Sequence, residues 1–130
     1  MNEQIQYYEN KLAFEADPSD LFDALGKGEN IVVIDTRKKE AFDREHIPGA
    51  LNLPHRNMSV ESTAKLSKEF LYVVYCDGIG CNASTKGAFN LTKLGFKVKE
   101  LIGGLEWWKK DGYATEGTFS TKGAIIECAC

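Results

Sequence analysis

Residues 71–84 read LYVVYCDGIGCNAS. The first five residues are apolar, β-branched or aromatic, a composition typical of a buried strand. Cys76 follows this run directly, and Gly78 and Gly80 indicate a tight loop after it. Apolar side chains then recur at helical spacing over residues 83–94. We therefore expect a strand, a tight loop and a helix in succession, with one thiol at the point where the strand ends.

The loop after Cys76 is suited to binding an anion. Glycine adopts positive φ without strain, so successive loop N–H groups can turn inward near the N-terminus of the following helix. Donors near a thiol favour its thiolate, which is the nucleophilic form. We therefore interpret Cys76 as the catalytic nucleophile rather than as a buried, unreactive thiol. The residues expected to hold the substrate are those of the loop: Asp77, Gly78, Ile79, Gly80, Cys81 and Asn82.

The composition limits the class of protein. The chain has 130 residues, enough for one hydrophobic core and too few for two ordinary domains. It is 43% hydrophobic and 27% charged with a formal net charge of −3, which argues against nucleic acid as a partner. No stretch approaches the roughly 20 apolar residues of a membrane helix, and no secretory signal pattern opens the chain. We expect a cytoplasmic protein without a membrane partner, and the composition leaves its oligomeric state open.

All four cysteines stand in the second half of the chain, at Cys76, Cys81, Cys128 and Cys130. Because the apolar content can supply a core and no signal peptide is visible, we expect reduced thiols rather than a disulfide scaffold. Cys81 is either a resolving thiol that attacks a modified Cys76 or a small side chain packed beneath the loop. Metal binding and sulfur relay are the alternatives for Cys128 and Cys130. Two adjacent thiols make an incomplete metal site, so we expect no metal, and the role of this pair stays open.

Strand-like and helical segments alternate along the chain. The pattern predicts strands over residues 11–15, 31–34, 50–53, 71–75 and 98–102, and helices over residues 21–25, 38–45, 60–70, 83–94 and 105–110. Such alternation favours a parallel sheet with helices on both faces. Ligands of such sheets bind at the carboxyl ends of the strands, where Asp35, Arg37 and Cys76 stand.

We expect a single domain over residues 11–113. Residues 1–10 are polar and predict an N-terminal extension or a short amphipathic helix, and residues 114–130 predict a C-terminal extension.

Four segments resemble, in order, motifs of the rhodanese family of sulfurtransferases. They are Ile34-Asp35-Thr36-Arg37, the stretch EHIPGALNLP at residues 45–54, Tyr75-Cys76, and Leu101-Ile102-Gly103-Gly104 with Trp107 and Trp108. Each motif is weak alone, and the ordered set is strong. The resemblance implies a rhodanese-like α/β fold of about five mainly parallel strands flanked by helices on both faces. It also implies a sulfurtransferase that needs no cofactor.

In the mechanism that this resemblance implies, Cys76 attacks the outer sulfur of a donor, keeps it as a persulfide and passes it to a thiol or another thiophilic acceptor. The common family loop, Cys-Arg-x-Gly-x-Arg, is altered at both cationic positions, where Asp77 and Cys81 stand. Because a guanidinium is missing, we expect weak activity on the dianion thiosulfate. A small-molecule or protein persulfide is the donor that the sequence favours.

The remaining polar and aromatic candidates have supporting roles. We expect Asp35 and Arg37 to fix loops through hydrogen bonds and an ion pair, with direct substrate contact as the alternative. His46 is expected to be structural, and His55 is a weaker candidate for a proton donor. Trp107 and Trp108 are expected to pack.

Three other functions stay open at this point. One is a noncatalytic interaction module, since a fold does not fix a function, and the intact nucleophile position argues against it. Another is a thiol-disulfide redox protein that uses Cys76 and Cys81. The third is a phosphatase or arsenate reductase, which the short loop and its lack of arginine disfavour.

Overall fold

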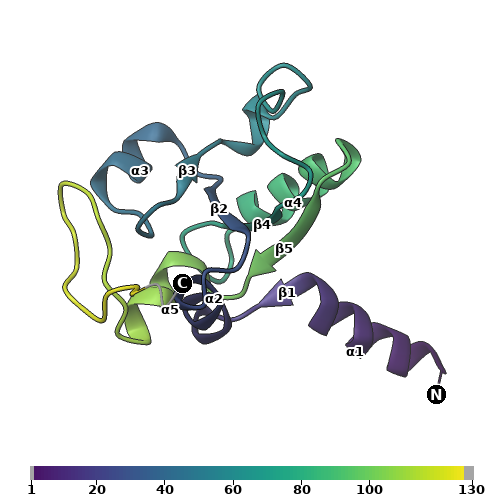
Figure 1. The fold of residues 1–130 in the computed structure, drawn as a ribbon, viewed down its shortest axis with the longest axis horizontal. Helices are drawn as coiled ribbons and strands as arrows, with labels where there is room; N and C mark the ends of the chain where they lie inside the picture. Colours follow the sequence, from purple (N-terminus) through teal and green to yellow (C-terminus); the bar gives the residue numbers. More distant parts are fainter. Residues whose placement is uncertain (1, 128–130) are drawn as a thin grey trace.

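Five parallel strands form the centre of the structure, a computed structural model that describes residues 2–127 (Figure 1). Their spatial order is β1-β5-β4-β2-β3, and every pair of neighbours is parallel. The strands are β1 (Glu15–Ala16), β2 (Ile31–Asp35), β3 (Leu51–Asn52), β4 (Leu71–Tyr75) and β5 (Lys97–Leu101). The expected parallel sheet is therefore confirmed, and it is parallel throughout.

The helices are α1 (Asn2–Phe14), α2 (Pro18–Gly26), α3 (Lys39–Arg44), α4 (Ala83–Lys93) and α5 (Gly104–Lys110), with a short 3-10 turn η1 (His55–Asn57). Helix α2 begins three residues before the predicted range of residues 21–25, and Asp17 caps it. The Asp17 side chain accepts a hydrogen bond from the N–H of Asp20, whose own side chain accepts from the N–H of Asp17. This reciprocal capping satisfies two N–H groups that a helix start leaves free.

The central strand β4 contributes to a core on each face of the sheet. Tyr72 and Val74 belong to a cluster with Leu91 of α4, whereas Val73 and Tyr75 belong to a cluster with buried residues of α2 and α5. Successive side chains of a strand point to opposite faces, so a strand buried on both faces must be apolar throughout. This double burial explains the continuous apolar run and confirms helices on both faces.

Two sequence predictions of secondary structure are wrong. Residues 60–70, expected as a helix, form a series of turns. There the Ser59 side chain accepts from the N–H of Ser62, the Thr63 hydroxyl donates to the Ser59 carbonyl, and such local bonds compete with a helix. Residues 11–14, expected in a strand, continue α1, and Lys11 of this helix forms an ion pair with Glu15, the first residue of β1.

The two end segments differ in how they meet the domain. Helix α1 projects away from the sheet (Figure 1) and has no buried residue. The segment after α5 instead returns to the domain through a bridge between His46 and Glu116, and it folds back on itself through a bridge between Tyr113 and Ala124. Among the helices of residues 2–127, none has the length and apolarity needed to cross a bilayer.

Candidate active site

Cys76 stands at the carboxyl end of the central strand and is 2% exposed. Its carbonyl accepts a hydrogen bond of 3.0 Å from the N–H of Leu105, and the Asp77 carbonyl accepts one of 2.8 Å from the N–H of Glu106. The first turn of α5 therefore holds the first two residues of the loop in place.

Gly104 makes this close approach of α5 possible. Its φ is +56°, and a Cβ atom at this position would collide with the carbonyl of Cys76. Only glycine combines that backbone conformation with a bare face. Gly104, part of the Gly103-Gly104 motif that resembles the rhodanese family, thus leaves room for α5 to pack against the backbone of the candidate nucleophile.

The loop folds back on itself and brings its two cysteines together. The N–H of Cys81 donates to the carbonyl of Gly78 at 3.3 Å, and Gly80 has a φ of +94°. We expect reduced thiols from the composition, whereas in the structure the sulfur atoms of Cys76 and Cys81 are joined as a disulfide. Their Cα atoms are 6.3 Å apart, a separation that the turn imposes and that composition could not reveal.

A hollow of about 190 Å³ lies beside Cys76. Its wall includes loop residues 78–81, the turn at residues 102–104 and two acidic side chains, Glu15 and Glu100, and no lysine or arginine is among the described residues that line it. The expected loop residues Asp77 and Asn82 are not in this wall. The hollow therefore presents negative rather than positive charge.

Glu100 lies at the start of α4, where the sequence predicts that a substrate anion binds. Its Oε2 atom accepts hydrogen bonds from the Ser84 hydroxyl at 2.7 Å and from the Thr85 hydroxyl at 2.8 Å. A carboxylate near a helix N-terminus is favourable because of the helix dipole. The protein thus supplies an anion of its own at this position, through a contact between α4 and β5, the strand that follows it.

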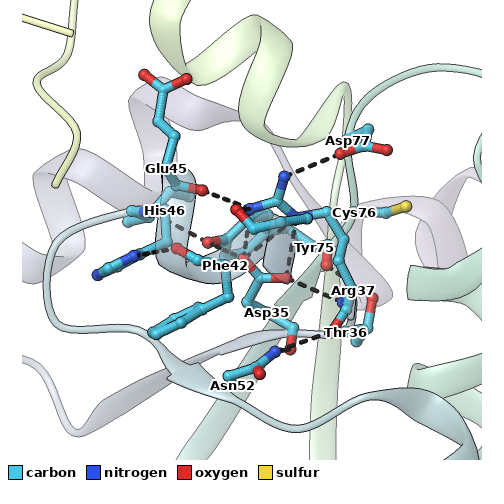
Figure 2. A network of polar contacts seen from close by, with 12 residues as sticks. Asp35, Thr36, Arg37, Phe42, Glu45, His46, Asn52, Tyr75, Cys76 and Asp77 are labelled. Atoms are coloured by element: carbon cyan, nitrogen blue, oxygen red, sulfur yellow. Dashed lines mark hydrogen bonds and ion pairs between the residues drawn. The ribbon is translucent and has the colours of Figure 1, made fainter. Parts of the chain in front are cut away.

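Arg37 links the end of β2 to the active-site loop (Figure 2). Its Nε and Nη2 atoms bind both carboxylate oxygens of Asp35, at 3.0 and 2.7 Å, and its Nη1 atom binds the Asp77 carboxylate at 2.9 Å. Burial lowers the pKa of Arg37, but the bonds and charge of Asp35 outweigh it and raise that pKa overall. Arg37 is therefore a permanent cation, as its expected loop-fixing role requires.

Tyr75 is a buried member of the same network that the sequence analysis did not identify. Its hydroxyl donates to the Asp35 carboxylate at 2.7 Å and accepts from the N–H of Ile47 at 3.0 Å. Burial and the neighbouring Asp35 charge raise the pKa of Tyr75, so its hydroxyl stays neutral. The available signal was a tyrosine as the last residue of an apolar run, because a buried tyrosine hydroxyl needs a polar partner.

The two histidines differ in position. His46 stacks on the ring of Phe42, and its Nδ1 atom lies 2.7 Å from the carbonyl of Phe42, a geometry that suits the expected structural role. His55 lies on η1 and lines a different hollow from the one beside Cys76. Burial, Lys86 and Arg56 lower the pKa of His55. The geometry therefore gives no support to His55 as a proton donor to Cys76.

Three potential metal ligands meet at the loop. The sulfur atoms of Cys76 and Cys81 and a carboxylate oxygen of Asp77 lie within 4.8 Å of one another. Two of these atoms are bonded to each other and do not offer thiolates in this state. The other cysteine pair of the sequence, at positions 128 and 130, lies outside the described residues.

The fold and this nucleophile position together define a family. The model of the rhodanese-like domain matches residues 17–111, and the chain belongs to that family. A curated relative, thiosulfate sulfurtransferase GlpE from Coxiella burnetii, is 40% identical over an alignment of 87 residues, and the match covers 65% of this chain and 78% of the relative. Thiosulfate sulfurtransferase 16 from Arabidopsis thaliana is 33% identical over 94 residues, with 64% and 78% covered.

A solved structure extends the similarity beyond the matched domain. The crystal structure of the BH2092 protein from Bacillus halodurans has a TM-score of 0.88 and 43% identity, and the match covers 95% of this chain and 90% of that one. A rhodanese-like domain from Anabaena matches with a TM-score of 0.72 and 30% identity over 81% of this chain and 80% of that one. The Bacillus match therefore includes most of the segments that flank residues 17–111.

Proposed function

We propose that this chain is a sulfurtransferase or sulfur carrier that moves sulfane sulfur through a persulfide on Cys76. The observation that carries the proposal is the position of Cys76 at the end of the central strand, held by α5 and next to a hollow. The sulfur atom of Cys76 points away from the Asp35–Arg37 network (Figure 2). Family membership and relatives named thiosulfate sulfurtransferases support the reaction class.

The proposed chemistry has two nucleophilic displacements. With the disulfide reduced, the Cys76 thiolate attacks the outer sulfur of a donor R–S–SH and expels R–S⁻, which leaves Cys76–S–SH. A thiol or another thiophilic acceptor then attacks the outer sulfur and takes it, and the Cys76 thiolate is released. Neither displacement requires a metal or an organic cofactor.

Charge around the loop favours a persulfide over thiosulfate as the donor. Thiosulfate carries two negative charges at a small reacting group, whereas the reacting end of a persulfide carries at most one. Glu15 and Glu100 line the hollow, and the guanidinium that contacts the loop, that of Arg37, is already bound to Asp35 and Asp77. A charge-assisted hydrogen bond contributes about 1.5–3 kcal/mol. We therefore propose that thiosulfate reacts at least about tenfold less efficiently than a persulfide.

The test is a comparison of kcat/KM for glutathione persulfide and for thiosulfate, with dithiothreitol as acceptor and sulfide production above the uncatalysed rate as readout. We expect the persulfide to be preferred and Cys76→Ser to abolish turnover of both donors. Cys128→Ser is the matched control for loss of a thiol outside the loop and should retain turnover. Undiminished turnover in Cys76→Ser would overturn the reaction, and a preference for thiosulfate would overturn the donor class.

A further inference from the structure

We propose that Cys81 is a resolving nucleophile that ends the life of the Cys76 persulfide by releasing its outer sulfur as sulfide. This inference rests on the persulfide proposed above and goes beyond it, because it gives the chain a second catalytic thiol and a second outlet for its sulfur. The nucleophile of this displacement is then a residue of the same loop, and the outer sulfur leaves as sulfide instead of passing to an acceptor.

The loop geometry carries this step. The Sγ atoms of Cys76 and Cys81 are bonded, which shows that the folded loop lets one sulfur reach the other. The Cα separation of 6.3 Å falls within the range of about 4.4–6.8 Å usual for disulfides. The hydrogen bond between Cys81 and Gly78 and the positive φ of Gly80 bend the chain into this position.

The atoms and electrons of the step balance. The inner sulfur of Cys76–S–SH is the Sγ atom of Cys76, which is the atom that Cys81 reaches in the structure. Attack by the Cys81 thiolate forms the Sγ–Sγ bond and breaks the bond between Cys76 Sγ and the outer sulfur. The electron pair leaves with the outer sulfur as HS⁻, and the proton lost by the Cys81 thiol completes H₂S. Hydrosulfide is a good leaving group because its conjugate acid has a low pKa.

A dithiol reductant restores the starting state. Cys81 is half-buried, whereas Cys76 is only 2% exposed, so an external thiol meets the sulfur of Cys81 first. Attack there forms a mixed disulfide with Cys81 and expels Cys76 as a thiolate. The second thiol of the reductant resolves the mixed disulfide and frees Cys81. In sum, two thiols of the reductant become a disulfide, and the loop regains both of its thiols.

The sequence allows this step to be observed on one peptide. Trypsin cleaves after Lys68 and after Lys86, so residues 69–86 form a peptide that contains Cys76 and Cys81 and no other cysteine. The reduced full-length chain is treated anaerobically with one equivalent of glutathione persulfide, desalted, held without added thiol, then alkylated with iodoacetamide and digested. Sulfide is measured on the same samples. Cys81→Ser and Cys76→Ser are treated in the same way.

In the wild type we expect the peptide first to gain one sulfur atom and then to convert to the internal disulfide, with one sulfide released for each disulfide formed. Cys81→Ser should keep the extra sulfur, with sulfide release slowed at least about tenfold, because the intramolecular attack is lost. Equal lifetimes of the persulfide in wild type and Cys81→Ser would overturn the role of Cys81, as would a disulfide formed without sulfide. No sulfur uptake by either would instead overturn the persulfide proposal on which this inference rests.

Discussion

The Nη1 atom of Arg37 lies 2.9 Å from the Oδ1 atom of Asp77, across 40 positions of sequence. The contact ties the strand end of β2 to the residue that follows the candidate nucleophile. Asp77 stands where the common family loop has an arginine, so here the cation comes from the segment after β2 and is shared with Asp35. Charge at this site is therefore organised as an internal ion network rather than as a free cation facing the substrate.

Arg37→Ala should destabilise the fold by about 3–5 kcal/mol, because it leaves the fully buried Asp35 carboxylate without its cation. Urea denaturation at neutral pH measures the loss. Asp77→Asn is the matched control, since the Asp77 side chain is 70% exposed and its ion pair contributes under about 1 kcal/mol. Similar losses of unfolding free energy in the two variants would contradict the distinction between the buried ion pair with Asp35 and the exposed one with Asp77.

Asp77→Arg should raise kcat/KM for thiosulfate by about tenfold, because it replaces a negative charge beside Cys76 with a donor for the dianion. The value for glutathione persulfide should change less. Asp77→Asn, which removes charge without adding any, should give a smaller gain for thiosulfate. The account of donor preference fails if Asp77→Arg folds normally and leaves the ratio of the two donors unchanged.

Tyr75→Phe should cost about 1–3 kcal/mol in the free energy of unfolding, since the N–H of Ile47 and the carboxylate of Asp35 each lose a buried partner. Tyr72→Phe offers a control on the same strand, because the Tyr72 hydroxyl makes one bond, to the carbonyl of Ser67. Its loss should be near 1 kcal/mol or less. A smaller cost for Tyr75→Phe than for Tyr72→Phe would contradict the assigned network.

Glu45 should make stability depend on pH. Burial raises the pKa of Glu45, but hydrogen bonds from Thr115, Thr121 and Lys109 outweigh it and hold that pKa below its ordinary value of 4.5. Since the folded-state pKa is depressed, the stabilisation is complete above the unfolded pKa and is lost as pH falls through the folded one.

Glu45→Gln should therefore cost about 1 kcal/mol at pH 7 and progressively less as the pH falls below about 4. Urea denaturation of wild type and variant across this range measures the difference. Glu116→Gln changes a carboxylate that is 60% exposed, and it should lower the free energy of unfolding by under about 0.5 kcal/mol across the whole pH range. A Glu45→Gln cost that stays constant with pH would contradict the titration.

The parts of the fold that the sequence predicts best are those with an unambiguous hydrophobic pattern. The apolar run at residues 71–75 matches β4, and the helical spacing over residues 83–94 matches α4 closely. A strand buried on both faces is apolar at every position, whereas a helix buried on one face is apolar at every third or fourth position, so the two patterns are easy to tell apart. Residues 60–70 have apolar side chains at a similar spacing, yet Ser59, Ser62 and Thr63 satisfy the backbone locally. Periodicity alone does not show whether such local side-chain bonds will favour turns over a helix.

The candidate site also has features that local sequence predicts and features that depend on tertiary structure. The position of Cys76 follows from local sequence, since a strand end, glycines and a helix start are adjacent in the chain. The contacts of Arg37 with Asp77 and of Glu100 with Ser84 join segments that only the folded sheet brings together. Composition indicates reduced cysteines, while the turn at Gly78–Cys81 decides which two sulfur atoms meet. Such relationships require tertiary structure.

The central claim is that sulfur resides on Cys76. Its most direct test is mass spectrometry of the reduced Cys81→Ser chain after exposure to glutathione persulfide, with fragmentation to locate any added mass. We expect one added sulfur atom on Cys76, removable by dithiothreitol and absent when Cys76→Ser is introduced as well. An unchanged mass, or an added sulfur atom that persists without Cys76, would contradict it.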